Sequence, residues 1–203
     1  MDERADLHHN ATDLNPYVDP SGHELQDDLE GDMLREECGL FGIFGHPSAS
    51  AITALGLHAL QHRGQEAAGI VSFDGNRFHS ERRLGLVGDT FSRRDVIEHL
   101  PGATAVGPVG YSTTGATILR NVQPLLAELH AGGFAVGHNG NLTNGLTLRR
   151  GLVRGGAMMQ STTDTEVILH LVAQSRRSRF IDRFIEALRA LEGAYSLVAL
   201  TNK

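Results

Sequence analysis

The single cysteine of this 203-residue chain, Cys38, is placed where it could act as a nucleophile. An acidic segment ends at Glu37, and an apolar, glycine-rich segment begins at Cys38. Cleavage of the Glu37–Cys38 bond would give Cys38 a free α-amine, whose pKa of ~7.7–8.0 leaves part of it neutral at pH 7. A neutral amine beside a thiol can act as its general base. The position therefore predicts a nucleophilic thiol that needs no separate histidine.

A plainer interpretation of Cys38 remains open. A lone cysteine in an intracellular protein is usually a small, buried, unreactive side chain. That interpretation predicts a soluble α+β domain whose thiol is inert towards electrophiles. With one cysteine the chain forms no internal disulfide, which excludes a disulfide-rich secreted domain.

The charge is distributed unevenly along the chain. Residues 1–37 contain 12 acidic residues and 2 arginines, whereas residues 38–203 contain 12 acidic and 16 basic residues. The first segment has no periodic apolar face, so we expect a disordered leader or propeptide at 1–37 and an ordered domain at 38–203. No secretory signal and no apolar stretch long enough for a membrane span are present. We therefore expect a cytoplasmic protein that binds neither membrane nor, given its net charge of −6, nucleic acid.

The elements expected after the leader are grouped rather than strictly alternating, which favours a layered α+β fold. Ser50 is expected to cap a helix that reaches His62. Thr163 and Glu166 have the spacing of a capping box at the start of another helix. Strands are expected at 38–45, 68–73, 77–82, 104–111, 134–138 and 195–201, and further helices at 146–154 and 180–188.

Four sequence blocks together resemble a known family. They are Cys-Gly-Leu-Phe-Gly-Ile-Phe-Gly at 38–45, Leu-Gln-His-Arg-Gly-Gln-Glu-Ala-Ala-Gly at 60–69, His-Asn-Gly-Asn-Leu-Thr-Asn at 138–144 and Thr-Asp-Thr-Glu at 163–166. In order and spacing they resemble the glutaminase domain, a class II glutamine amidotransferase, of the amidophosphoribosyltransferase family. The resemblance covers about residues 38–203. It implies an N-terminal-nucleophile hydrolase fold, a four-layer αββα sandwich with two stacked antiparallel sheets.

The resemblance also implies catalytic roles. Cys38 would attack the side-chain amide of glutamine, release ammonia and leave a thioester that water hydrolyses. The side chain of Asn139 and the backbone N–H of Gly140 would form the oxyanion hole, although an Asn-Gly pair alone is typical of a plain turn. Arg63 matches an active-site arginine, although an arginine at a helix end is commonly solvated.

Further residues match positions that bind the substrate. Asp164 corresponds to the ligand of the glutamine α-amino group, although an acid in the first turn of a helix is favourable in itself. Thr113 corresponds to a residue that contacts the α-carboxylate, and Gly64 belongs to the same binding region. No spacing of histidines and acidic residues indicates a metal site.

The chain departs from the family pattern beside Thr113. Where the family has Gly-His-Val-Arg-Tyr, this chain has Pro108 in place of histidine and Gly110 in place of the arginine that holds the α-carboxylate. Loss of one partner of a desolvated charge pair costs roughly 2–5 kcal/mol. We expect glutamine capture to be weakened on the order of 30- to several-thousand-fold. A degenerate, non-catalytic module that binds a small amide or a partner domain is therefore the alternative function.

The resemblance further implies a phosphoribosyltransferase partner. The family continues into a transferase domain that uses the ammonia with phosphoribosyl pyrophosphate to make 5-phosphoribosylamine for purine synthesis. This chain ends at Lys203 without that domain's sequence signals, so we expect the transferase to be a missing domain or a separate chain. Mg²⁺ with phosphoribosyl pyrophosphate would belong to that part, and no cofactor is expected in this one. A full-length enzyme is expected to be a homo-oligomer.

Overall fold

The computed structural model of the protein describes residues 38–110 and 118–203. The elements in chain order are β1 (Gly39–Phe44), α1 (Ala49–Ala59), η1 (Gln61–Arg63), β2 (Ala67–Phe73), β3 (Phe78–Leu84), α2 (Val87–Phe91), α3 (Arg94–Glu98), β4 (Thr104–Gly110), η2 (Leu119–Asn121), β5 (Leu125–Leu129), β6 (Gly132–Leu142), α4 (Gly145–Arg154), α5 (Asp164–Gln174), α6 (Phe180–Arg189) and β7 (Gly193–Thr201). Within these ranges, no helix is both long and apolar enough to cross a lipid bilayer.

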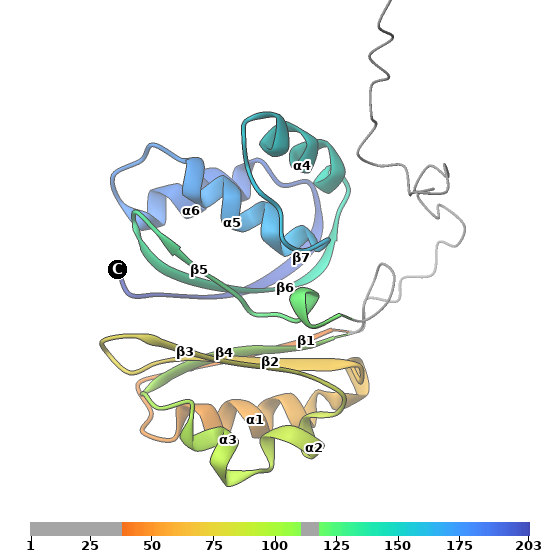
Figure 1. The fold of residues 1–203 in the computed structure, drawn as a ribbon, viewed down its shortest axis with the longest axis vertical. Helices are drawn as coiled ribbons and strands as arrows, with labels where there is room; N and C mark the ends of the chain where they lie inside the picture. The colour runs from red at the N-terminus through yellow and green to blue at the C-terminus, as the bar shows by residue number, and fades with distance from the viewer. Residues whose placement is uncertain (1–37, 111–117) are drawn as a thin grey trace, which may run out of the picture. The chain divides into compact units, whose positions relative to one another are not determined.

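The strands form two antiparallel sheets that face each other. One sheet has the order β1-β4-β2-β3, and the other has the order β5-β6-β7. Helices α1 to α3 cover the outer face of the first sheet, and α4 to α6 cover the outer face of the second (Figure 1). The predicted four-layer αββα sandwich is confirmed by this arrangement.

Burial on both faces explains the composition of the central strands. β2 and β4 have continuous buried runs because helices pack on one side of their sheet and the second sheet packs on the other. Between the sheets the core consists of small or branched side chains, namely Val71, Val106, Ala135 and Leu200. Separate apolar clusters lie beneath the two helical layers.

Pro108 occupies a central strand, which is an unusual place for proline. β4 pairs with β1 without interruption, including Leu40 opposite Pro108. On the other side, the β2–β4 register is recorded at Ala67 and Ala68 and resumes at Val71. The gap falls opposite Pro108 and Gly107, where a proline has no N–H to donate. The sheet tolerates this proline by leaving that part of the ladder unpaired.

Three local expectations differ from the structure. Ser50 does not cap α1 but lies inside it, buried, because its hydroxyl donates to the carbonyl of Leu100 at 2.6 Å. Thr163 and Glu166 form no capping box, because the Glu166 carboxylate accepts hydrogen bonds from residues further upstream. The helix after Ser50 also ends at Ala59, and η1 then continues to Arg63.

The β2–β3 hairpin should lose stability in acid. Asp74 accepts hydrogen bonds from the backbone N–H of Arg77 and of Asn76, both at 2.8 Å, and its carboxylate contacts His79. The Arg77 bond, then His79 and Asn76, hold the pKa of Asp74 well below its ordinary value of 3.8. A depressed carboxyl pKa gives stability that is present above the unfolded-state pKa and is lost as the pH falls below about 4. Thermal unfolding between pH 5 and pH 2 should therefore be less pH-dependent for Asp74→Asn than for the parent; equal slopes would contradict this.

Candidate active site

A cavity of about 290 Å³ lies at the beginning of β1. It is lined by Cys38, Gly39, Leu40, Leu60, Arg63, Asn139 and Ser196. Its volume lies at the small end of the range of ligand pockets, which suits a ligand the size of an amino acid. The structure thus brings three predicted catalytic residues, Cys38, Arg63 and Asn139, to one cavity from three separate elements or their ends.

Two side chains fix the carbonyl group of Cys38. Arg63 Nε donates to this oxygen at 3.0 Å, and Asn139 Nδ2 donates to it at 3.0 Å. Arg63 reaches it from η1 at the end of the first helical layer, and Asn139 reaches it from β6 of the second sheet. The backbone of Cys38 is therefore held from both sides, so the direction in which its side chain leaves the backbone is restricted.

The Asn139–Gly140 pair lies in a strand, not in the plain turn that such a pair commonly forms. Both residues belong to β6, where Asn139 pairs with Ser196 and Gly140 with Tyr195. Gly140 has φ +133°, and a Cβ there would lie 2.3 Å from the carbonyl oxygen of Ala194. Only glycine suits this backbone. The amide of Asn139 has two N–H groups, so one can hold Cys38 while the other serves a substrate oxygen.

Gly64 and Gly110 bring the backbone close to the thiol. A Cβ at Gly64 would lie 2.5 Å from the backbone nitrogen of Gly110, so no side chain fits there without moving β4. A Cβ at Gly110 would lie 3.0 Å from Cys38 Sγ. The predicted substrate-region residue Gly64 therefore lies against the strand end that borders the nucleophile.

The Gly110 geometry makes the missing arginine testable. Among the described residues, a Cβ at residue 110 would lie 3.0 Å from Cys38 Sγ and 3.9 Å from Cys38 Cβ, and rotation of the thiol can relieve the closer contact. We expect Gly110→Arg to raise kcat/KM for glutamine at least ~30-fold by supplying a carboxylate partner. Gly110→Met adds similar bulk without charge and should give no gain. Equal kcat/KM values for the parent and both variants, from steady-state ammonia release, would contradict the role of a cation at this position.

Asp164 lies outside the cavity lining but is tied to the strand that carries Asn139. Its Oδ2 accepts a hydrogen bond from the backbone N–H of Leu142 at 3.1 Å. A Cβ at Gly145 would lie 2.6 Å from its Oδ1, so the carboxylate is closely packed against the start of α4. The structure thus connects Asp164 to the far end of β6. Thr113 lies outside the described residues.

Sequence reasoning missed several residues of the cavity wall. Ser196 lies beside Asn139 because β7 pairs with β6 in that register, and Leu60 follows the end of α1. The strand expected at 195–201 included Ser196, but the sequence did not show how it pairs with the strand expected at 134–138. That register is what places Ser196 beside Asn139. A larger hollow of about 450 Å³ lies along α6, where Arg177, Asp182, Ile185, Glu186 and Arg189 line it without a nucleophile. Among the described residues, no group of three histidine, cysteine or acidic side chains is placed to hold a metal ion.

Comparison with known proteins identifies relatives of this chain. The family model described as "Glutamine amidotransferase domain" matches residues 114–203. The chain is 62% identical over 175 residues to the amidophosphoribosyltransferase of Rhizobium etli, covering 86% of this chain and 35% of that protein. It is 45% identical to the amidophosphoribosyltransferase of Lacticaseibacillus casei, covering 83% of this chain and 87% of the relative.

A solved structure gives the same result at the level of the fold. The glutamine phosphoribosylpyrophosphate amidotransferase from B. subtilis, complexed with ADP and GMP, matches with a TM-score of 0.74 and 40% identity over 80% of this chain. The chain spans about a third of the length of that structure and of the Rhizobium relative. With the cavity around Cys38 and Asn139 built on this shared fold, the chain belongs to the amidophosphoribosyltransferase family and contains its glutamine amidotransferase domain.

Proposed function

We propose that the chain hydrolyses glutamine to glutamate and ammonia through a thioester on Cys38, once residues 1–37 have been removed. The observation that carries this proposal is that Asn139 and Arg63 both hold the carbonyl of Cys38 at the edge of one small cavity. An amide donor next to Cys38 supports acyl transfer at its thiol. The removal of residues 1–37 provides the α-amine that serves as base.

The reaction has two steps, formation of a thioester on Cys38 and its hydrolysis. The α-amine of Cys38 takes the thiol proton as Sγ attacks the side-chain carbonyl carbon of glutamine, and the carbonyl oxygen becomes an oxyanion. The free N–H of the Asn139 side chain and the N–H of Gly140 stabilise that charge. As the intermediate collapses, the α-ammonium protonates the amide nitrogen, the C–N bond breaks and ammonia leaves. Water then attacks the thioester, with the α-amine again as base, and glutamate and the thiol are released.

The released ammonia implies an acceptor reaction. The Rhizobium relative is an amidophosphoribosyltransferase of which this chain covers 35%, which supports a phosphoribosyltransferase domain or chain as the partner. There the ammonia would displace pyrophosphate from phosphoribosyl pyrophosphate, a glycosyl transfer that gives 5-phosphoribosylamine for purine synthesis. Mg²⁺ would bind with that substrate in the transferase part. We further propose that the full-length enzyme is cytoplasmic and homo-oligomeric.

One experiment tests the glutaminase proposal directly. The intact mass of the purified chain shows whether residues 1–37 have been removed, and ammonia release is measured on the same sample. Loss of residues 1–37 together with glutamine-dependent ammonia release is the expected result. A processed chain that releases no ammonia from glutamine would refute the proposal and favour the non-catalytic module. A full-length chain that is active would refute the α-amine as base.

A further inference from the structure

Glu166 is a buried carboxylate with no assigned role in the reaction. It lies in the first turn of α5 and is 6% exposed. One carboxylate oxygen accepts a hydrogen bond from the backbone N–H of Gln160 at 2.7 Å. The other accepts from the backbone N–H and the hydroxyl of Ser161, at 2.8 and 2.9 Å. Burying a charge is costly unless it is compensated in this way, so Glu166 holds the two residues firmly.

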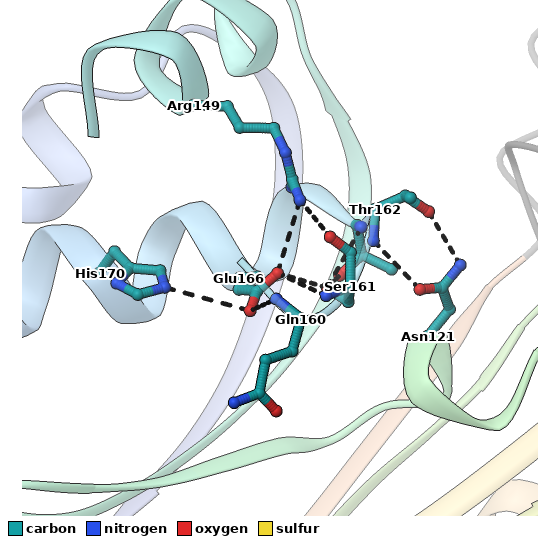
Figure 2. Close-up of polar contacts among 8 residues, drawn as sticks. Asn121, Arg149, Gln160, Ser161, Thr162, Glu166 and His170 are labelled. Carbon is teal, nitrogen blue, oxygen red and sulfur yellow. Dashed lines mark hydrogen bonds and ion pairs between the residues drawn. The ribbon is translucent and has the colours of Figure 1, made fainter. Parts of the chain in front are cut away.

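Side chains of α4 and η2 also bond the turn formed by residues 160–163 (Figure 2). Arg149 of α4 donates to the carbonyl of Ser161, and its guanidinium lies 3.6 Å from Glu166 Oε2. Asn121 of η2 makes two hydrogen bonds with Thr162, one to its hydroxyl at 2.9 Å and one from its backbone N–H at 3.1 Å. The turn 160–163 is thereby joined to α4, α5 and η2.

This turn leads directly into Asp164. Asp164 is the first residue of α5, so its backbone direction depends on the turn that precedes it. Its carboxylate in turn accepts the hydrogen bond from Leu142 at the end of β6. A displacement of the turn would therefore move the Asp164 carboxylate relative to β6, although Glu166 itself does not line the cavity.

We propose that Glu166 is a positioning residue that fixes Asp164 for recognition of the substrate α-amino group. The inference rests on the proposed glutaminase function and on the assignment of Asp164 to that group. Glu166 acts through the turn 160–163, with Arg149 and Asn121 as its supports. It contributes to the choice between glutamine and amides that lack an α-amine, not to the chemical step.

A substrate pair tests this role in the processed chain. We compare kcat/KM for glutamine with kcat/KM for 4-carbamoylbutanoate, which is glutamine without its α-amine. Glu166→Gln is expected to lower the preference for glutamine about tenfold, mainly through KM, and Asp164→Asn gives the reference loss. Glu186→Gln is the matched control, because Glu186 also contacts a serine hydroxyl and an arginine but lies on α6. Equal losses on both amides would show a merely structural role and overturn the inference.

A second measurement does not depend on activity. Hydrogen exchange of the Leu142 amide reports whether Asp164 keeps its bond to β6, and Glu166→Gln should accelerate that exchange about tenfold while Glu186→Gln does not. Unchanged exchange would overturn the inference even if glutamine hydrolysis is confirmed. If the processed parent hydrolyses neither amide, the proposed function fails and the Leu142 exchange still decides the positioning role. Should Glu166→Gln not fold, Asn121→Ala, which removes the two bonds to Thr162, is expected to shift both readouts about threefold in the same directions.

Discussion

Cys38→Ala is expected to abolish glutamine-dependent ammonia release, with kcat reduced by at least ~10⁴-fold. The substitution removes the atom that forms the thioester, and removal of a nucleophile from an acyl-transfer site costs up to about 10⁶-fold in kcat. The fold should persist, because Cys38 lies at the edge of a cavity and belongs to none of the apolar core clusters. Ammonia release and intact mass are measured on the same sample, so that loss of the nucleophile is distinguished from failure to remove residues 1–37.

Cys38→Ser separates the contribution of Cys38 to chemistry from its contribution to packing. A hydroxyl keeps the shape of the side chain but is a much weaker nucleophile at neutral pH than a thiol, so hydrolysis should remain below about a hundredth of the parent rate. A thermal unfolding midpoint close to that of the parent would show that the loss is chemical. Turnover by Cys38→Ala within tenfold of the parent would refute Cys38 as the nucleophile.

Asn139→Ala is expected to lower kcat by about 10²–10³-fold, which corresponds to ~2.7–4 kcal/mol of transition-state stabilisation. KM should change little, because the oxyanion exists only after the thiol has attacked. The Cys38 carbonyl keeps a partner in this variant, because the substitution leaves Arg63, whose Nε donates to it at 3.0 Å in the parent, in place. The loss therefore reports chiefly on the oxyanion and less on the position of the nucleophile.

A second asparagine provides the control for Asn139. Asn144 follows β6, where its amide donates to the carbonyl of Ala190 and accepts from the N–H of Glu192. Asn144→Ala removes these two hydrogen bonds away from the cavity, against the one from Asn139 to Cys38, so it should lower the unfolding temperature and leave kcat within about threefold. If both variants lost kcat equally, Asn139 would have a structural role and not a catalytic one. The kinetics of ammonia release report the change in kcat, and thermal unfolding followed by circular dichroism reports the change in stability.

The residues of the candidate site were more predictable than the elements around it. The resemblance of the block at 138–144 pointed to Asn139, whose side chain lies within hydrogen-bond distance of the Cys38 carbonyl. The strand β5 was missed because Leu-Leu-Ala-Glu-Leu consists largely of good helix formers, and its strand conformation comes from pairing with β6, with Leu125 opposite Val136. The helices α2 and α3 were missed because five residues are too few to show a helical period.

Buried polar residues caused the errors in helix capping. Ser50 and Glu166 have the residue types of capping positions, yet Ser50 bonds a residue distant in sequence and Glu166 bonds residues just upstream of its helix. Propensity at a helix end describes local hydrogen bonding only, whereas these two side chains satisfy backbone groups that the tertiary fold has buried. At Gly110 the sequence showed that the family's arginine is replaced, but only the structure shows that this residue lies next to the Cys38 thiol.

The hydrogen bond from Asn139 of β6 to Cys38, the residue before β1, makes the geometry of the candidate site depend on the distance between the two sheets. Cys38 precedes a strand of one sheet and Asn139 belongs to the other, so a hydrogen bond of 3.0 Å bridges the layers. The side chains between the sheets, such as Val106 and Ala135, set that spacing. The volume of side chains packed between the sheets therefore affects the distance between Cys38 and Asn139. A methyl group added or removed between the sheets is expected to change the geometry of the site even though it does not line the cavity.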